Sequence, residues 1–430
     1  MIMRMSGRRH VSRSSVWLVP MLYAVIALAA GLTIPRFEHR FWPEFVSPMS
    51  VSAALAIYSA IASGMIALTG IVFSLTFVMV QFSATAYSPR LVLWIARDPV
   101  MSHSLGVFVA TFLYAIAAVA GVDRNGSGKV PFLSVWIVIG LLLVSVAMFV
   151  ALTHRIGLLQ IHRMLTFTGD QGRAVISTLY PPLEGTQPAV EPRKFQGERL
   201  TQTLEYRGGP RSIQALHFAG LAELAQRSGG VIEMLVTVGD TVVELMPLAK
   251  VWDAENAIDE RELRQQIELG GERTFEQDPK YVIRLLVDIA IRALSPAVND
   301  PTTAVQALDQ IEDQLMRLGL RRLDIGEFRA GGELRLVVPF PTWDDFLLLA
   351  FDEIRYCGAT SVQVMRRMMA LVSDLIDVLP AERHAGLRYW RERIESTIAR
   401  SFEDAEEKKV AAIEDRQGIG VPLRRPSRQS

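Results

Sequence analysis

Residues Val51 to Val80 read VSAALAIYSAIASGMIALTGIVFSLTFVMV and contain no charged side chain. A helix rises about 1.5 Å per residue, so roughly 20 apolar residues cross a hydrocarbon core of about 30 Å. This run is longer than that, which predicts a tilted or bent transmembrane helix that continues beyond one face of the membrane. The sequence is therefore that of a membrane protein.

Small residues recur along this run at helical spacing. In lipid, a stripe of small side chains lets the backbone of another helix come close, which is how membrane helices associate. We therefore expect this face to pack against another helix or to face a pore on a shared axis. Its members are Ala53, Ala56, Ala60, Ser63, Ala67, Gly70 and Ser74, followed by polar Gln81 on the same side.

Three further apolar runs predict three more spans. The four predicted spans cover residues 16–34, 51–80, 104–121 and 131–152. The first run is long for a signal peptide and offers no small-residue cleavage site, so we expect it to stay uncut and to end at Pro35. Lys and Arg gather before the first span, between the second and third, and after the fourth. By the positive-inside rule, both termini are then cytoplasmic.

The amino-acid composition limits which partners and metal sites are expected, and it indicates a cellular compartment. The 430 residues contain 45 Lys and Arg against 45 Asp and Glu, and this balance gives no reason to expect a nucleic-acid partner. Cys357 is the only cysteine, which excludes an intramolecular disulfide and a cysteine-cluster metal site. A reducing cytoplasm suits such a chain.

Charge is concentrated after residue 152, and the pattern there predicts an α+β region. The predicted fold class is an α-helical membrane domain of four transmembrane helices, followed by a cytoplasmic α+β region with a small β module and a helical C-terminal part. The predicted boundaries are a transmembrane domain 1–165, a connector 166–198, a β-rich module 199–255, a mainly helical domain 256–402 with a β-hairpin at 323–338, and a charged disordered tail 403–430.

Residues Val236 to Val251 resemble half of a lipoyl- or biotinyl-type barrel. In such carrier domains, a lysine at the tip of the hairpin holds the cofactor. Here Leu245 and Met246 occupy the tip, and Lys250 lies beyond it. We therefore expect a structural β module and no cofactor.

The stretch from Glu272 to Ala304 holds the candidate binding residues. Asp278-Pro279 and Asp300-Pro301 are both strong helix starts, because Asp caps free N–H groups and proline lacks a donor that the first helical position does not need. Two interpretations stay open. One is a pair of capped helices with a surface ladder of ion pairs. The other is a polar pocket in which the helix N-terminus after Asp300 meets arginines and binds an anion. The candidate ligand-binding residues are Arg273, Arg284, Asp288, Arg292, Ser295, Asn299, Asp300 and Thr303.

The same stretch resembles a known family. The family's signature is matched by ERT at 272–274, QDP at 277–279, DIA at 288–290, RALSP at 292–296, NDP at 299–301 and TA at 303–304, with FSLT at 73–76 and YSPR at 87–90. These motifs resemble the predicted bacterial membrane proteins grouped as domain of unknown function 2254. The resemblance runs from the first span to about Leu379. It implies a multi-pass protein of the bacterial inner membrane, without an assigned activity.

The sequence offers no constellation typical of an enzyme or a metal site. His154 and His162 share a helix face but lie two turns apart, about 12 Å, which is too far for one metal ion. Gly126 to Lys129 lacks the first glycine of a P-loop. Asp344 and Asp345 open a helix, where carboxylates suit the helix dipole. We expect neither catalysis nor a bound metal.

Two classes of function compete. The first is an oligomeric channel or transport-type protein with a cytoplasmic regulatory domain, favoured by the small-residue stripe. The second is a membrane-anchored sensor or scaffold that binds a small anionic ligand or a protein partner near Arg273 and Asp300. No charge falls inside the four predicted spans, which weighs against the channel because intramembrane ionisable groups often mark ion pathways. Hydrophobic gates keep the first class open.

Overall fold

The computed structural model describes residues 18–41, 47–86, 99–122, 130–157, 161–183, 195 and 197–420. The chain divides into two compact units, which are the membrane unit, Arg9–Gln160, and the C-terminal unit, which includes Ile161–Ser430. The division falls a few residues before the predicted boundary at 165. The turn predicted at 123–129 and the YSPR motif at 87–90 lie outside the described residues.

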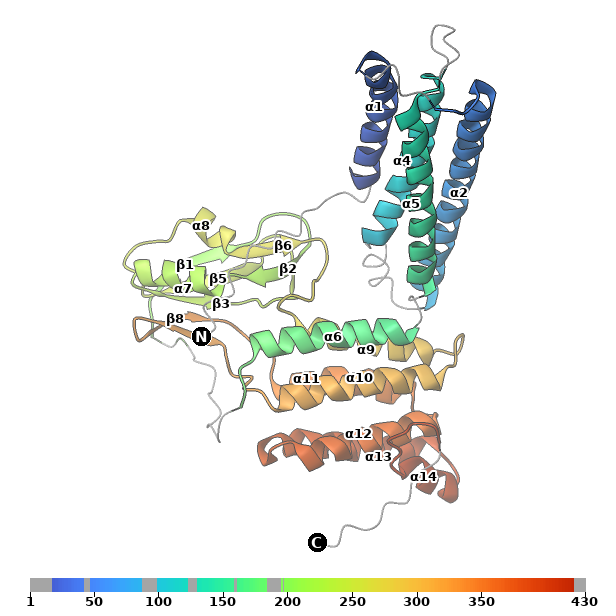
Figure 1. The fold of residues 1–430 in the computed structure, drawn as a ribbon. Coiled ribbons are helices and arrows are strands. Elements are labelled where there is room, and N and C mark those ends of the chain that lie inside the picture. Colours follow the sequence, from blue (N-terminus) through green and yellow to red (C-terminus); the bar gives the residue numbers. More distant parts are fainter. Residues whose placement is uncertain are drawn as a thin grey trace. The chain divides into compact units, whose positions relative to one another are not determined.

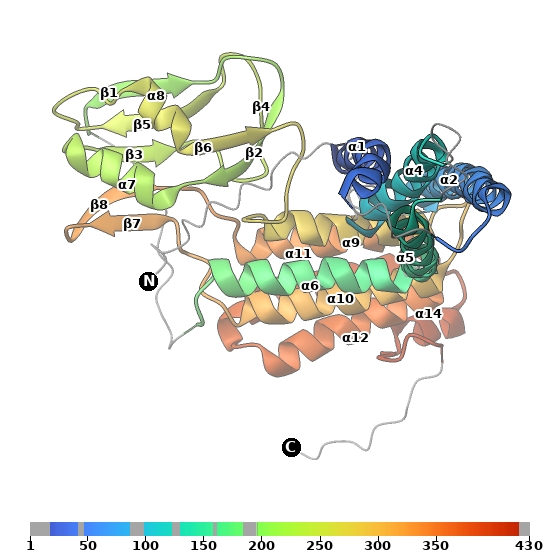
Figure 2. The same ribbon diagram turned by 45° about the horizontal axis from the view of Figure 1, so that its top comes forward.

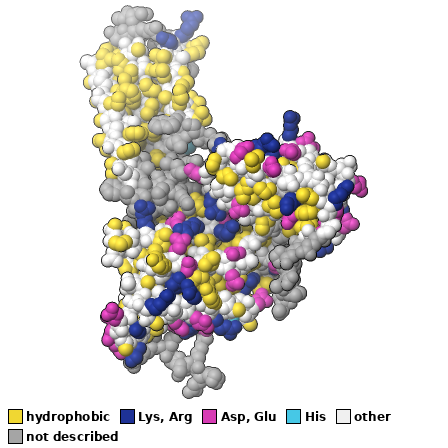
Figure 3. Space-filling model, turned by 180° about the vertical axis from the view of Figure 1, so that it is seen from behind, with side chains coloured by type: hydrophobic (Ala, Val, Ile, Leu, Met, Phe, Trp, Pro, Cys, Tyr) yellow, Lys and Arg dark blue, Asp and Glu magenta, His cyan; other side chains and the backbone are white. Residues whose placement is uncertain are grey.

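The membrane unit consists of long apolar helices lying side by side (Figure 1). Within the described part of the chain, four helices are long and apolar enough to cross a membrane, as predicted. Figure 3 shows hydrophobic side chains spread over the visible face of this unit, as lipid contact requires. The helices are α1 (Leu18–Phe41), α2 (Val51–Ala86), α4 (Pro99–Val119) and α5 (Phe132–Gly157).

The first span does not end at Pro35, as the sequence suggested. Helix α1 continues through this proline to Phe41. Neighbouring elements make a proline tolerable inside a membrane helix, and here Pro35 packs against Gly121 in the turn that follows α4. A Cβ atom added to Gly121 would lie 2.6 Å from the Pro35 Cβ, so only glycine fits opposite the ring. The extra turns carry Glu38, which the sequence had placed in a loop, into the bundle.

Helix α4 is the central helix of the membrane unit, because it packs against α1, α2 and α5. Half of its span is buried inside the chain, against 22% for each of the other three spans. Small residues make this possible: a Cβ atom on Gly31 of α1 would lie 2.7 Å from the Cβ of Ala117. Within the membrane unit, small residues therefore form a close contact between α1 and α4.

The C-terminal unit contains two β-sheets over one apolar core (Figure 2). Among the described residues, one sheet has five strands in the order β1-β5-β3-β8-β7 and the other has three in the order β4-β2-β6. The core draws on both sheets and on the helix α7. The elements are β1 (Leu200–Glu205), β2 (Arg211–Leu216), α7 (Phe218–Arg227), β3 (Val231–Met234), β4 (Thr241–Val242), β5 (Pro247–Trp252), α8 (Glu260–Gln265), β6 (Ile267–Gly270), β7 (Glu327–Ala330) and β8 (Glu333–Val337).

The predicted hairpin near 323–338 exists as β7 and β8, but it does not belong to a separate helical domain. Strand β8 pairs in parallel with β3, with Ile232 opposite Leu336. Strand β6, which lies in the segment predicted to be mainly helical, pairs antiparallel with β2 of the β-rich segment. The segments predicted as separate domains at 199–255 and 256–402 therefore share both sheets.

The rest of the C-terminal unit is a stack of helices in three layers (Figure 1). Helices α6 and α9 form one layer, α10 and α11 the next, and α12 and α13 the third. Asp278 and Asp300 cap α9 and α10 through their side chains, with proline next in the chain, as predicted. The bounds are α6 (Ile161–Leu179), α9 (Pro279–Ala293), α10 (Pro301–Gly319), α11 (Trp343–Cys357), α12 (Val362–Val378), a 3₁₀ turn η3 (Ala381–Arg383), α13 (His384–Ser401) and α14 (Ala405–Ala412).

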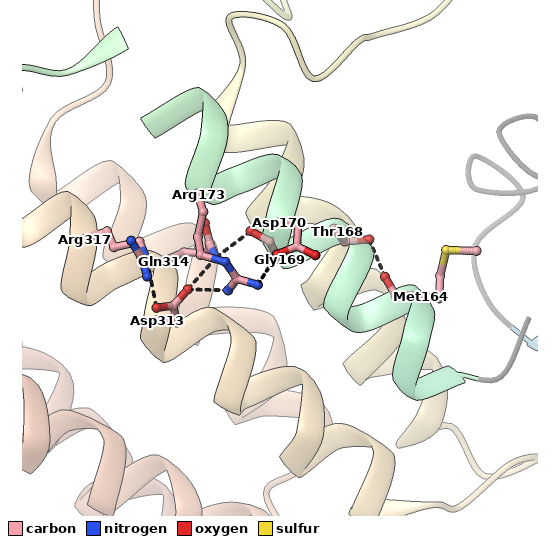
Figure 4. A network of polar contacts seen from close by, with 8 residues as sticks. All are labelled: Met164, Thr168, Gly169, Asp170, Arg173, Asp313, Gln314 and Arg317. Carbon is pink, nitrogen blue, oxygen red and sulfur yellow. Dashed lines mark hydrogen bonds and ion pairs between the residues drawn. The ribbon is translucent and has the colours of Figure 1, made fainter. Parts of the chain in front are cut away.

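Helix α6 occupies residues for which the sequence predicts the start of a connector. Gly169 and Gly172, which fall in the predicted connector, lie on the helix face that contacts α10. A Cβ atom on Gly172 would lie 2.1 Å from the Gln314 side-chain oxygen, so glycine permits the close approach. Arg173 then bridges Asp170 at 2.6 Å and Asp313 of α10 at 2.7 Å (Figure 4).

Residues 403–420, which the sequence predicts as part of a disordered tail, have a defined structure. They form α14 and then a turn in which the Asp415 carboxylate, 2% exposed, accepts the N–H groups of Gln417, Gly418 and Gly420. Arg366 of α12 donates to the carbonyl oxygens of Ile413 and Gly420. Hydrogen bonds from the buried Arg366 side chain thus stabilise a segment for which the composition predicted disorder.

Candidate functional site

The Arg273 guanidinium binds Asp278 rather than a helix N-terminus. Its Nε lies 3.1 Å from Oδ2 of Asp278, and Oδ1 accepts the N–H of Tyr281 at 3.0 Å. Asp278 is 1% exposed. Burial raises the pKa of the Asp278 carboxyl, and the charge of Arg273 opposes that rise. Both carboxylate oxygens are therefore bonded, as in a structural ion pair.

The β-turn at Gly239 closes over this pair. Gly239 has φ +90°, and a Cβ atom there would lie 2.1 Å from Arg273 Nη2 and 2.2 Å from Asp278 Oδ2. A cavity beside Asp278, lined also by Tyr180 and Lys280, has a volume of about 10 Å³. Such a space holds roughly one water molecule. The ion pair packs against the turn at Gly239 and so connects the β-sheet region to the start of α9. The cavity beside it is too small for a metabolite.

Arg284 is neutralised by two carboxylates. It contacts Asp288 one turn along α9 at 2.6 Å and Glu353 of α11, whose Oε2 lies 3.0 Å from Nη2. Hydrogen bonding to Glu353 is the main cause that raises the pKa of Arg284, and the same bond lowers the pKa of Glu353. The predicted ladder on α9 thus continues across to another helix. Arg292 lies in the last turn of α9.

The side chain of Asp300 caps the N-terminus of α10. Asp300 accepts the Thr303 N–H at 3.1 Å and the Thr303 hydroxyl at 2.6 Å. The preceding turn places Asn299 at φ +49°, with its N–H on the Ser295 carbonyl at 2.8 Å. The free N–H groups that an anion would use are partly taken by these side chains.

The eight candidate ligand-binding residues therefore do not form one pocket. Arg273 lies at the start of α9 and Asp300 follows its end, about 22 Å away for fifteen residues of helix. The separation follows from the order of the elements. Asp278 caps the start of α9 and Asp300 caps the start of α10, so the full length of α9 lies between the two Asp-Pro pairs. Helix caps at Asp278 and Asp300 and ion pairs at Arg273 and Arg284 are present, as one of the two interpretations expects.

A second polar group lies inside the membrane unit. Glu38 of α1 is 5% exposed, and its Oε1 accepts the N–H of Leu133 at the start of α5 at 3.0 Å. Its Oε2 is buried and has no hydrogen-bond partner among the described residues. Glu38 is the last residue of the candidate span Leu18–Glu38, which extends beyond the predicted limit of the first span at residue 34.

Three buried hydroxyl groups lie near this carboxylate. Tyr58 of α2, Tyr114 of α4 and Ser134 of α5 are each 1% exposed. Tyr58 and Tyr114 belong to the same buried cluster of the bundle, and Ser134 follows Leu133, whose N–H group Glu38 accepts. None of the three hydroxyl oxygens has a hydrogen bond of normal geometry within the described part of the chain. Together with Glu38 they make an oxygen cluster contributed by all four membrane helices, which we call the Glu38 cluster.

The small-residue stripe of α2 faces outward. The helix turns Ala54, Tyr58, Ala62, Met65 and Val72 into the bundle. The candidate packing or pore-facing residues Ala56, Ala60, Ser63, Ala67, Gly70, Ser74 and Gln81 are all exposed. Gly70 lines an apolar groove of about 570 Å³ that α2 forms with α1 and α4. Among the residues that the structure describes, the stripe is therefore not buried against another helix.

The described residues contain few other groups that are typical of a metal site or a catalytic site. No group of three or more His, Cys, Asp or Glu side chains with metal-binding geometry occurs there. Cys357 is a free, exposed thiol, and partial burial raises its pKa, which disfavours the reactive thiolate.

These features define a multi-pass membrane protein that carries a folded α/β unit. The chain belongs to the family described as predicted membrane protein DUF2254, whose model matches residues 13–374. The resemblance seen in the motifs is thereby confirmed. An uncharacterized protein of Mycobacterium bovis is 28% identical over 376 residues, which cover 84% of this chain and 71% of that protein. An uncharacterized protein of Mycobacterium tuberculosis matches with the same values. No solved structure matches the chain.

Sequence reasoning missed the Glu38 cluster because it stopped the first span at Pro35. A signal was present: Ala27, Gly31, Pro35 and Glu38 recur at spacings of three and four residues, the period of one helix face. All four are buried in the bundle. The proline rule for soluble helices was applied where membrane packing overrides it.

Proposed function

We propose that the protein is an oligomeric channel or transport-type protein of a bacterial inner membrane, regulated by its C-terminal unit. One observation carries this proposal: the small-residue face of α2 lies on the outside of the membrane unit. Small side chains at regular helical spacing favour close helix packing in lipid. A second copy of the same chain is the partner that we assign to this face.

The Glu38 cluster supports a transport role. Ionisable side chains are costly in a bilayer, and where they occur they face the interior of a bundle and commonly mark ion or proton pathways. Glu38 meets that description, with 5% exposure inside a bundle of apolar helices.

The regulatory role of the C-terminal unit is argued from chain continuity. Helix α6 follows the last membrane helix after three residues and is tied to α10 by the Arg173 network. A change in the helix stack is then transmitted to the end of α5 through a short connection. We place this unit and both termini in the cytoplasm on the positive-inside rule.

The alternative is a membrane-anchored sensor or scaffold. Its anionic-ligand form lacks support, because Arg273 and Arg284 each bind carboxylates of the chain itself. We assign no catalytic role, no cofactor and no nucleic-acid partner to the protein.

Oligomeric state and conduction test the proposal together. Native mass spectrometry of the purified protein should show an oligomer, and proteoliposomes should pass ions. Ala60→Leu, which adds bulk to the stripe, should convert the oligomer to monomer and abolish flux. Ala29→Leu is the matched control, because Ala29 is also exposed but lies on α1, outside the stripe. A monomeric wild type, or equal behaviour of the two variants, contradicts the proposal.

Reporter fusions test the orientation. A fusion after Arg163 should report the cytoplasm, and one at Asn125, between the third and fourth helices, should report the opposite side. Two fusions on one side contradict four spans.

A further inference from the structure

Residues 413–420, which we call the tail segment, lie on the helix stack without burying an apolar side chain. The large apolar side chains of the segment are exposed, Ile413 by 43% and Ile419 by 69%. Only Asp415 and Gly418 of the segment are buried. Apolar burial is the main term that offsets the entropy lost when a chain is ordered. Hydrogen bonds and ion pairs therefore supply most of what holds the tail segment in place.

Arg366 of α12 binds both ends of the tail segment. Its Nε lies 3.1 Å from the carbonyl oxygen of Ile413, and its Nη1 lies 2.8 Å from the carbonyl oxygen of Gly420. The side chain is 3% exposed, and among the described residues its hydrogen-bond acceptors all belong to this segment. Its Nη2 is buried without a partner among them. A buried guanidinium thus recognises main-chain oxygens, which is how many peptide-binding sites hold an extended ligand.

Charged side chains on either side of this arginine match those of the tail segment. The Glu414 carboxylate lies 2.5 Å from the Ser373 hydroxyl oxygen and 3.4 Å from Nη2 of Arg391. Arg416 pairs with Asp374. Partly exposed ion pairs of this kind add little stability, but opposite charges select a partner and fix its register. The charges of α12 and α13 are therefore complementary to those of the tail segment.

A turn inside the tail segment gives it the shape that fits. Oδ1 of Asp415 accepts the N–H groups of Gln417 and Gly418, each at 3.1 Å, and Oδ2 accepts the N–H of Gly420 at 2.8 Å. A Cβ atom on Gly418 would lie 2.3 Å from Cγ1 of Val305 on α10, so a larger residue would not fit there. The bonds that shape the turn thus lie within the segment, whereas the surface that receives it belongs to the helix stack.

We propose that the helix stack carries a peptide-binding site centred on Arg366, and that the tail segment is a latch that leaves and re-enters this site while the stack stays folded. Release exposes little apolar surface, because the segment buries no apolar side chain. It leaves Arg366 with donors that lack an acceptor among the described residues, which favours rebinding. The inference goes beyond the proposed transport function, since release and rebinding require neither an oligomer nor flux.

Hydrogen–deuterium exchange of the purified full-length chain in detergent tests the release. Amides that exchange through a local opening are labelled before those that need global unfolding. We expect peptides from residues 413–420 to exchange at least about tenfold faster than the buried centre of α12, although Asp415 binds several of their N–H groups. Exchange of the tail segment no faster than that of α12 would make it a fixed part of the fold, and the inference would fail.

Arg366→Lys tests whether this arginine holds the latch. Lysine keeps the charge but cannot donate to both ends of the segment, so exchange of the tail segment should rise about tenfold while α10 and α12 keep their protection. Arg367→Lys is the matched control, because Arg367 is 4% exposed on the same helix but pairs with Asp309 and Glu312 of α10. It should leave exchange of the tail segment unchanged. Equal acceleration in both variants contradicts a site centred on Arg366.

Binding of a free peptide tests whether the site recognises the segment as a ligand. The probe is a fluorescent peptide of residues 405–420, and its anisotropy is measured with the full-length chain. Asp415→Ala loosens the tethered segment but leaves Arg366 in place, so this variant should bind the peptide about tenfold more tightly than the wild type, whose own tail competes. Adding Arg366→Lys should abolish that gain. Equal binding by the wild type and Asp415→Ala, or a gain that survives Arg366→Lys, would overturn the inference.

Discussion

Asp278 and Glu38 are both buried carboxylates, but they differ in how their oxygens are used. Both oxygens of Asp278 are bonded, one to the Tyr281 N–H and one to Arg273. Glu38 bonds through one oxygen among the described residues. The capping role of Asp278 was predictable, because an Asp-Pro start is local. The closure by Gly239 was not, because that turn comes from a distant strand pair.

Gly239→Ala should lower the free energy of unfolding by about 1–3 kcal/mol, since it introduces a Cβ atom at a positive φ and against the Arg273–Asp278 pair. Gly209→Ala is the control, because Gly209 has an ordinary φ and open space around it. Chemical denaturation followed by tryptophan fluorescence measures both. Equal stability of the two variants would show that the turn does not close over the ion pair.

The raised pKa of Asp278 predicts a pH dependence of stability. A carboxyl whose pKa is higher in the folded chain than in the unfolded chain binds its proton more tightly when folded. Its contribution to stability is complete below the unfolded pKa and is lost as pH rises through the folded pKa. Asp278→Asn keeps a capping side chain but cannot titrate, so the decline in stability from about pH 4 upward should be smaller in this variant. Parallel curves for wild type and variant would contradict the assignment.

At the scale of elements, glycine and proline were the residues most easily misinterpreted. Gly169 and Gly172 suggested a connector, and Pro35 suggested a helix end. Each instead lies inside a helix where another helix approaches closely. The element was mispredicted because local propensity was weighed without knowledge of the facing helix, which only the tertiary structure supplies. Helices started by Asp278 and Asp300 were predicted well, because their caps are encoded within a few residues.

Gly172→Ala tests which effect governs α6. Helix propensity alone favours alanine over glycine by about 1 kcal/mol. The new Cβ atom would meet the buried Gln314 and Val282 side chains, so we expect a net loss of about 1–3 kcal/mol instead. Gln314→Ala in the same chain should recover part of this loss, measured as a coupling energy in a double-mutant cycle. A stabilised Gly172→Ala protein would mean that α6 does not pack this closely on α10.

For the molecule as a whole, the sequence predicted the four apolar helices, the mixed α/β region after them and the family. It did not predict that β7 and β8 join the sheet of the preceding segment, because parallel pairing between distant strands leaves little local signal. Nor did it place the polar group within the bundle. The direction of the α2 stripe also required the structure, since a small-residue face suits internal and external partners equally.

Cysteine cross-linking in native membranes tests most directly whether the stripe of α2 joins copies of the chain. Because Cys357 is the only cysteine, Cys357→Ser gives a cysteine-free background. In it, Ser63→Cys places a thiol on the stripe, and Ala29→Cys places one on the equally exposed face of α1. We expect oxidation to convert the Ser63→Cys protein to covalent dimers while the Ala29→Cys protein stays monomeric. No dimer from Ser63→Cys, or equal dimer from both positions, would contradict it.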